Sequence, residues 1–388
     1  MKTRTPEEFG RLLDELRQFM ESRVIPAEDW HNASAHDAHS PVVRDLQQQA
    51  GRRGLGSPIA AQELGGMALS WEESCEVLEL AGRSYLGPVV LRCAPPGQPD
   101  IYALQKLASS GQRDRYVRRL QSGEIASCFA MTEPPPGAGS DPSMMLTTAT
   151  KSEDGWVLNG RKWFITGAGK ADVAIVVART DQGVSWFLVD TRTPGFQIVR
   201  DISTLEPFDM GGHGEILLTD CILPHDALIG EVGRGLEYAQ LRLEGARLFH
   251  CMRYIGLASR AIDFARDYAL QRQSGGQPLA QHQLVQSLVA DAHIKLYAAR
   301  LMTRDVACRL DRGESIRHHS SMAKVFVSEA VFEVADAAVQ LCGALGVSDD
   351  APVSMIFRML RPFRIYDGAS EVHRSAIARR VFNRKLSA

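Results

Sequence analysis

The 388-residue sequence lacks an excess of charge of either sign, and this limits its partners. Lys and Arg number 44 against 46 for Asp and Glu, which gives a formal net charge of -2 at pH 7. A nearly neutral chain has no overall attraction for nucleic acid or for an anionic membrane. The one dense basic cluster, RSAIARRVFNRK near the C-terminus, is explained more simply as a solvated helix face than as a DNA-binding patch. We therefore expect no nucleic-acid partner.

Paired cysteines and long apolar runs are also missing. The seven cysteines are scattered, odd in number and without a Cys-x-x-Cys pair, which favours reduced, buried thiols over disulfides or a zinc site. The first segment, MKTRTPEEFGRLLDELRQFMES, places acids among its apolar residues, unlike a signal peptide or a membrane span. We expect a cytoplasmic protein with no metal site and no membrane association.

The length and the periodicity of the apolar residues predict three domains. A single core stops growing near roughly 250 to 300 residues, so this chain is expected to divide. Residues 1–124 carry apolar residues at helical spacing, residues 125–240 carry short runs rich in Val, Ile, Trp and Phe, and residues 241–388 return to long amphipathic stretches. This order predicts an α+β protein with a middle sheet domain and two helical zones that pack together.

Local signals within the first two zones predict a cap and two turns. Asp100 follows the proline-rich break CAPPGQP and is a candidate cap for the next helix. The pairs Asp154-Gly155 and Asn159-Gly160 are typical hairpin turns, and we expect both to separate strands.

Two stretches of the middle zone contain the densest chemistry. CFAMTEPPPGAGSD, residues 128–141, enters a loop whose prolines and glycines suit close approach of a flat or phosphorylated ligand. GRKWFITGAG, residues 160–169, places Phe164 and Thr166 on one side of a strand because side chains alternate. An aromatic face beside a hydroxyl donor suits an isoalloxazine ring. Each stretch by itself is also compatible with an ordinary turn and a half-buried strand.

In this order and spacing the two stretches resemble the flavin-binding signatures of the acyl-CoA dehydrogenase family. The resemblance extends over essentially the whole chain through four further blocks, LRLEGARLFHCMRYIGLASRAI (241–262), RQSGGQPLAQHQLVQ (272–286), AVQLCGALGV (338–347) and RIYDGASEVHR (364–374). It implies an N-terminal helical domain, a middle β-barrel or sheet domain and a C-terminal four-helix bundle. It also implies a homodimer or homotetramer in which FAD lies at a subunit interface.

The same resemblance implies the residues that hold FAD. Those lining the flavin and its pyrophosphate from the middle domain are Phe129, Met131, Thr132, Ser140, Phe164 and Thr166. Phe164 is expected to pack on the ring and Thr166 to donate near N5. From the neighbouring subunit, Arg272 is expected to reach the pyrophosphate, while Gln340 and Gly343 shape the other end of the groove.

Asp367 is the candidate catalytic base. In the family, the position directly before this glycine usually holds the glutamate that removes the α-proton of an acyl thioester while a hydride leaves the β-carbon for flavin N5. The backbone N–H of residue 367 and a flavin hydroxyl are expected to polarise the thioester carbonyl. Partial desolvation is expected to raise the pKa of Asp367 toward the working pH. From the residues alone, Asp367 is equally a candidate cap for a helix beginning near Ser370.

Other residues complete the expected substrate site. Some family members supply the base from the position matched here by Ala246, which has no proton acceptor. Glu244 matches a position that contacts the pantetheine arm, and Arg247, Tyr366 and Gly368 are expected to surround the acyl group.

Four departures from the family pattern concern the cofactor and the base. The loop after Thr132 is two residues longer than usual, Gly275 replaces a phenylalanine, and Ala369 replaces a threonine. The aspartate at 367 is one methylene shorter than glutamate, and a misplacement of roughly 1 Å can cost on the order of a hundredfold in rate. A branch of the family carries Asp in a similar setting.

The function implied is FAD-dependent α,β-dehydrogenation of an acyl thioester, carried by coenzyme A or an acyl carrier protein. An electron-transfer flavoprotein or similar acceptor would take the electrons. Two alternatives stay open: a nitroalkane oxidase-like flavoprotein, which also uses an aspartate base on this fold, and a non-catalytic DNA-binding homologue.

Overall fold

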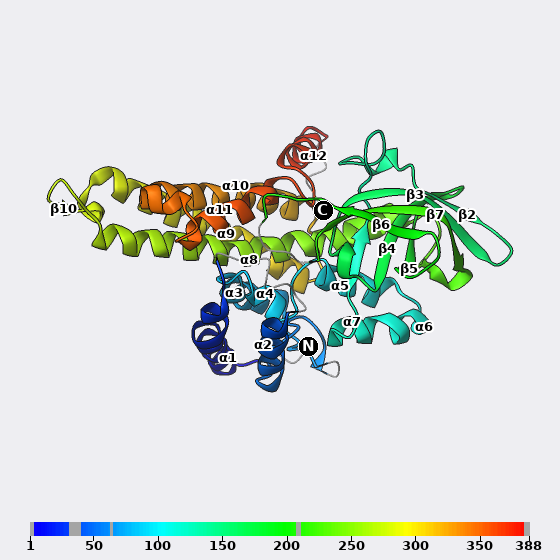
Figure 1. Cartoon of the computed structure of the whole chain (residues 1–388), viewed down its shortest axis with the longest axis horizontal. Coiled ribbons are helices and arrows are strands. Elements are labelled where there is room, and N and C mark those ends of the chain that lie inside the picture. The colour runs from blue at the N-terminus through cyan, green and yellow to red at the C-terminus, as the bar shows by residue number, and fades with distance from the viewer. Residues whose placement is uncertain (1–3, 31–39, 63–64, 207–210, 384–388) are drawn as a thin grey trace.

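The computed structural model describes residues 4–30, 40–62, 65–206 and 211–383, and it shows the expected order of helix, sheet and helix (Figure 1). The helices of the first part are α1 (Pro6–Phe19), α2 (Pro41–Arg52), α3 (Trp71–Gly82), α4 (Gly87–Val90), α5 (Gly97–Leu107), α6 (Ser110–Gln112) and α7 (Arg118–Ser122). Residues Thr5 and Ser70 begin α1 and α3 as capping boxes, in which the cap hydroxyl and a glutamate three residues later satisfy free backbone N–H groups.

Asp100 is not the cap that the sequence suggested. Helix α5 begins earlier, after Pro96, so Asp100 lies inside the helix and is fully buried. Its carboxylate accepts hydrogen bonds from Arg242 Nε at 2.6 Å and from Ser127 Oγ at 2.7 Å. The residue therefore joins the first helical part to the other two parts of the chain.

The middle part is one sheet. Its strands are β1 (Ser127–Ala130), β2 (Thr148–Lys151), β3 (Gly155–Thr166), β4 (Val173–Thr180), β5 (Gly183–Asp190), β6 (Phe196–Asp201), β7 (His213–Pro224) and β8 (Leu228–Ile229). They are ordered β6-β7-β3-β2-β4-β5-β8, with β1 paired in parallel to β4.

One of the two predicted turns is confirmed and the other is wrong. Strands β2 and β3 form a hairpin in which Lys151 pairs with Trp156, so Asp154-Gly155 lies at its turn. Asn159-Gly160 lies inside β3, where the pairing with β7 shifts register. An Asn-Gly pair is favoured both at a hairpin turn and at such an irregularity, because glycine accepts backbone angles that other residues avoid.

The last part is helical and surrounds one long helix. It contains α8 (Gly235–Gln271), the small hairpin β9 (Gln273–Ser274) and β10 (Gln277–Pro278), α9 (Gln283–Asp311), α10 (Arg317–Cys342), α11 (Pro352–Leu360) and α12 (Ser370–Phe382). Helix α8 begins six residues before residue 241, where the sequence pattern suggested that the helical zone starts. Helix α12 begins at Ser370, as expected.

Helix α10 is the one described segment that is long and apolar enough to cross a membrane by length and composition alone. It packs against α8 and α9 within the helical part. Its Lys324 is fully buried and donates to the carbonyl of Gly368. A core helix of a helical bundle has these same properties.

The two helical parts share one core, as predicted. Buried residues of α1 to α4 and of α8 to α11 form a single hydrophobic cluster, and Figure 1 shows the first helices packed beneath α8 with the sheet at one end. Two glycines bring α3 and α8 into close contact. A Cβ at Gly82 would fall 2.0 Å from the Arg253 carbonyl oxygen, and one at Gly256 would fall 2.0 Å from that of Glu79. Any side chain at either position would push the helices apart.

Candidate active site

Asp367 and Gly368 form a tight turn before α12. Their φ angles are +54° and +96°, in the region that favours glycine. Three side chains from different helices hold the turn: Arg247 Nε donates to the Asp367 carbonyl at 3.0 Å, Lys324 Nζ donates to the Gly368 carbonyl at 2.8 Å, and His373 Nε2 donates to the Asp367 carbonyl at 3.2 Å. The backbone of the candidate base is therefore fixed from α8, α10 and α12.

The helix-cap alternative for Asp367 is wrong. The N-cap of α12 is Ala369, which makes no side-chain cap bond. The Asp367 side chain instead faces α8, where its Oδ2 lies 3.3 Å from Nε2 of His250. The side chain is 16% exposed, and Oδ2 accepts no well-aligned hydrogen bond from the described residues.

The surroundings of Asp367 keep its carboxylate ionised. Burial by itself raises the pKa, but the interaction with His250 and the positive charges of Arg242 and Arg247 outweigh it and lower the pKa to about 2. The expected rise toward the working pH is therefore not found in the ligand-free protein. The sequence near residue 367 indicates desolvation alone, because the cations that oppose it lie more than a hundred residues away along the chain.

The predicted substrate residues do gather around this carboxylate. Tyr366 directly precedes it, and its hydroxyl donates to the Tyr254 hydroxyl at 2.7 Å. Glu244 lies close to Arg247, and burial raises its pKa while the charge of Arg247 opposes the rise. Ala246 is buried and offers no competing base.

Four residues at this site were missed by the sequence analysis: His250, Arg253, Lys324 and His373. A signal for two of them was present, since Arg247, His250 and Arg253 follow one another at spacings of three on α8 and so share a helix face. Lys324 gave no such signal, because only the folded chain brings it to residue 367. His373 lies in the same segment as Asp367, six residues further on, but its spacing did not predict that its ring binds the Asp367 carbonyl.

The loop after β1, which the sequence predicted to bind flavin, is organised by Glu133, which was also missed. Its carboxylate accepts hydrogen bonds from the backbone N–H groups of Ala138, Leu146 and Thr147 at 2.7 to 3.0 Å and from Lys162 Nζ at 3.0 Å. Burial opposes its ionisation, but Lys162 and these donors lower its pKa to about 2. This loop, which is two residues longer than is usual in the family that the sequence resembles, is thus held in place by the buried ion pair between Glu133 and Lys162.

The predicted ring-contact residues lie at the edge of this loop. Phe129 is covered by the Arg242 guanidinium, whose carbon lies 4.0 Å from the ring centre. Lys162 Nζ also donates to the carbonyl of Met131 at 3.0 Å, and the carbonyl of Thr132 accepts from the Trp163 N–H at 3.0 Å. The last two bonds fix the backbone at Met131 and Thr132 against β3, whereas Phe129 lies in β1 and contacts α8 through Arg242.

Phe164 and Thr166 face away from the sheet core, on the side opposite the buried Ile165. A register shift in β3 leaves Phe164 with a φ of +51° and an exposed fraction of 47%. Thr166 Oγ1 lies 3.1 Å from His213 Nδ1. An exposed phenylalanine on a strained strand position is costly unless something covers it. With the exposed Ser140 on the adjacent loop, these residues fit a flat aromatic cofactor with a phosphate-bearing tail.

The three residues expected to serve a neighbouring subunit lie elsewhere. Arg272, Gln340 and Gly343 are exposed, and Arg272 follows the end of α8 that is remote from the sheet (Figure 1). A helix of 37 residues is about 55 Å long. One chain therefore cannot bring Arg272 to the residues of its own sheet that are predicted to bind flavin.

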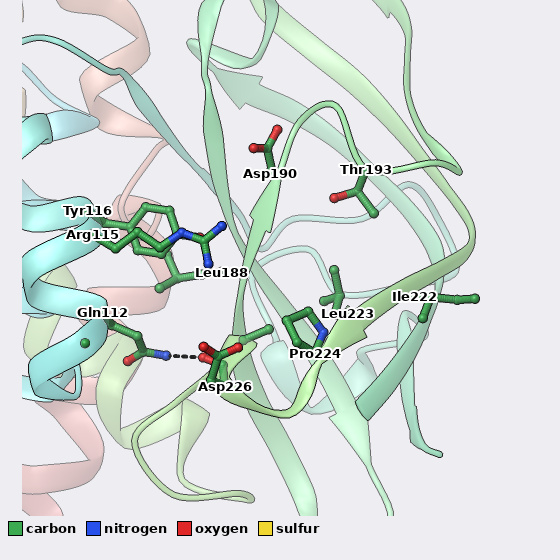
Figure 2. A pocket seen from close by; sticks show the side chains of 12 residues that line it. Gln112, Arg115, Tyr116, Leu188, Asp190, Thr193, Ile222, Leu223, Pro224 and Asp226 are labelled. Atoms are coloured by element: carbon green, nitrogen blue, oxygen red, sulfur yellow. Dashed lines mark hydrogen bonds between the residues drawn. The ribbon is translucent and has the colours of Figure 1, made fainter. Parts of the chain in front are cut away.

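A cavity of about 160 Å³ lies between α6 and the sheet, lined by residues that include Gln112, Arg115, Asp190 and Asp226 (Figure 2). Gln112 Nε2 donates to the carbonyl of Asp226 across it at 2.7 Å. None of the predicted site residues lines this cavity, so it does not locate the acyl site. Among the described residues, no group of three His, Cys, Asp or Glu side chains is arranged to hold a metal ion.

Comparison with known proteins covers nearly the whole chain. Family models match in order: acyl-CoA dehydrogenase N-terminal domain (6–124), middle domain (128–221) and C-terminal domain (233–382). The chain is 33% identical to acyl-CoA dehydrogenase family member 11 of Gallus gallus, over 95% of this chain and 50% of that protein. It is 34% identical to the acyl-CoA dehydrogenase FadE2 of Mycobacterium tuberculosis, over 96% and 95%. A solved structure described as an acyl-CoA dehydrogenase from Mycobacterium abscessus superposes with a TM-score of 0.91 at 32% identity, covering 99% of this chain and 100% of that one. The chain thus spans about half the length of the first relative and nearly all of the second.

Proposed function

The chain belongs to the acyl-CoA dehydrogenase family of flavoprotein oxidoreductases, and we propose that it oxidises an acyl thioester to its α,β-unsaturated product. FAD is its cofactor. The observation that carries the proposal is Asp367, an ionised and largely buried carboxylate in a turn fixed by Arg247 and Lys324. A carboxylate that is already ionised can accept a proton without first losing one.

The residues of this chain act on the α-carbon and on the carbonyl. Asp367 accepts the α-proton, and its backbone N–H donates to the thioester oxygen as negative charge develops there. Arg247, Lys324 and His373 keep this N–H and the carboxylate in fixed relation by binding the two carbonyls of the turn. FAD, when bound, accepts the hydride from the β-carbon.

The shorter arm of Asp367 is supported by this turn. The carbonyls of Asp367 and Gly368 each accept a hydrogen bond from a cationic or imidazole donor. The position of the carboxylate is therefore determined mainly by the fixed backbone and less by side-chain rotation. Asp367 has two side-chain torsions against three in glutamate, so less rotamer freedom is lost when it is ordered. The proposal is that the substrate α-carbon approaches closer to the backbone than it does beside a glutamate.

The assembly is proposed to be a homo-oligomer that shares its FAD sites. Exposed apolar side chains line the outer face of α9: Leu284 at 83%, Ile294 at 65%, Tyr297 at 65% and Leu301 at 52%. A stripe of this size on a helix favours contact with another chain. The remote position of Arg272, Gln340 and Gly343 supports the same arrangement. An electron-transfer flavoprotein is the proposed acceptor, and the cytoplasm is the proposed location.

The nitroalkane oxidase-like alternative rests on the same aspartate and requires a direct test. Purified flavoprotein is mixed anaerobically with a panel of acyl thioesters and nitroalkanes, and bleaching of the flavin absorbance is followed. Reduction by a thioester with formation of the trans-2-enoyl product supports the proposal. Fast reduction by nitroalkanes and none by any thioester would establish the alternative.

The DNA-binding alternative has less support. Within the described part of the basic cluster, Arg374 lies 3.5 Å from the carboxylate of Glu329, so part of its charge is neutralised. Residues 384 and 385 of the cluster lie outside the described residues. Salt-dependent DNA binding without any flavin reduction is the result that would favour this alternative.

A further inference from the structure

His250 has a defined tautomer because of Arg253. The Arg253 guanidinium places Nε 3.2 Å and Nη2 2.9 Å from Nδ1 of His250. A guanidinium has only donors, so Nδ1 must accept with its lone pair and the ring proton lies on Nε2. That nitrogen is the one that faces Oδ2 of Asp367 at 3.3 Å.

We propose that His250 and Arg253 are positioning residues for the base: Arg253 fixes the His250 tautomer, and the Nε2–H dipole of His250 keeps the Asp367 carboxylate ionised and oriented. Nε2 lies 3.3 Å from Oδ2 without forming an aligned hydrogen bond, so the interaction is electrostatic. The inference rests on the proposed function, in which Asp367 takes the α-proton. No bond is made or broken at His250, and no proton leaves it.

His250 itself is not a candidate base, because its Nδ1 accepts from Arg253 and its Nε2 already carries the ring proton. Burial and the charge of Arg253 lower its pKa to about 4, so the ring is neutral at pH 7. Aromatic rings enclose it, with ring-centre distances of 4.8 Å to Tyr366, 5.6 Å to Phe363 and 5.9 Å to Tyr254. A neutral donor stabilises a carboxylate less than an imidazolium would, which leaves Asp367 able to accept a proton.

The other charged groups near Asp367 bind its backbone or act at longer range. On α8, Arg247 donates to the Asp367 carbonyl and Arg242 adds positive charge. On α10, Lys324 donates to the Gly368 carbonyl, and on α12, His373 donates to that of Asp367. The negative charge of Glu206, from the segment after β6, raises the pKa of His250 and opposes Arg253. Of these described neighbours, His250 is the one whose side-chain nitrogen lies within 4 Å of a carboxylate oxygen of Asp367.

The tautomer is tested without turnover. The oxidised, FAD-loaded protein is labelled with ¹⁵N-histidine, and the His250 signals are assigned by comparison with His250→Gln. The expected result is a neutral ring with the proton on Nε2 from pH 8 down to about pH 5, since the pKa is about 4. A proton on Nδ1, or titration near 6.5, would overturn the proposal. The result of this NMR measurement does not depend on whether the protein acts on thioesters.

The effect on the base is tested by the pH dependence of flavin reduction. His250→Phe keeps a ring but removes the donor, so the acid limb of the reduction rate should move upward by about one pH unit or more. His250→Gln restores an N–H donor and should return the limb toward the wild-type position. Arg266→Gln, on the exposed face of the same helix, is the matched control and should leave the profile unchanged.

The kinetic outcomes separate the inference from the function on which it rests. A wild-type profile in His250→Phe, with normal flavin content, would refute the positioning role. Wild-type protein that no thioester reduces would refute the proposed function and leave the tautomer result to decide this inference. If His250→Phe fails to fold, Arg253→Gln serves instead: with the positive charge gone, His250 should titrate closer to 6.5.

Discussion

The most decisive perturbation is Asp367→Asn, which keeps the size of the side chain and removes the proton acceptor. The native pKa of Asp367 falls from an ordinary 3.8 to about 2, which corresponds to about 2 kcal/mol in favour of the ionised folded form. Because the folded-state pKa is depressed, this stabilisation is present above pH 3.8 and is lost as the pH falls through 2. At pH 7 the variant should therefore be less stable by up to about 2 kcal/mol, while it still folds.

The loss in rate should be much larger than this loss in stability. Removal of a general base costs on the order of a hundred to ten thousandfold. Anaerobic stopped-flow measurement of flavin bleaching with a thioester substrate gives the reductive rate, and FAD content and thermal unfolding give the state of the fold. Asp336→Asn, an exposed aspartate on α10, is the matched control. A variant that stays yellow and reduces its flavin within about threefold of wild type would refute the assignment of Asp367 as the base.

Asp367→Glu should retain reduction within about tenfold of wild type, with a changed chain-length preference, because the longer arm restores the usual reach; inactivity toward every thioester would count against the proposed geometry. Lys162→Met leaves the Glu133 carboxylate buried without its cation, which should cost about 3 to 5 kcal/mol. Thermal unfolding of the FAD-loaded protein measures this loss, and an unchanged midpoint would show that the ion pair does not hold the loop. Arg272→Gln should weaken FAD binding by about ten to a hundredfold, as expected for the loss of a charge-assisted bond to phosphate. Fluorescence titration of apoprotein with FAD measures this, and unaltered affinity would remove Arg272 from the cofactor site.

The sequence predicted those elements whose signals are local. The helix beginning at Ser370 and the turn at Asp154-Gly155 follow from residue type and spacing alone. The Asn159-Gly160 pair failed because a register shift inside a strand and a hairpin turn select the same residues. Only the pairing partner distinguishes them, and that partner lies some sixty residues further along the chain.

The charge partners at the site could not be predicted from residues that are close together in the sequence. Asp100 was expected to cap a helix because nothing nearby revealed Arg242, with which it forms a buried ion pair. In the same way, the pKa of Asp367 depends on His250 and on cations of α8 that the fold brings together. Sequence similarity pointed to Asp367 as the candidate base, but it carried no information on what keeps this carboxylate ionised.

The length of α8 has a consequence that genetics can reveal. Asp367 lies near the middle of this helix, and Arg272 follows its remote end. In the shared-site arrangement that we propose, each FAD site combines Asp367 of one chain with Arg272 of another. A mixed dimer of Asp367→Asn and Arg272→Gln chains then holds one site with both defects and one site with none. At an FAD concentration too low to fill the Arg272→Gln sites, each variant alone should therefore be inactive. The two should complement each other when co-expressed, and activity should return in the fraction of molecules that pair one chain of each kind.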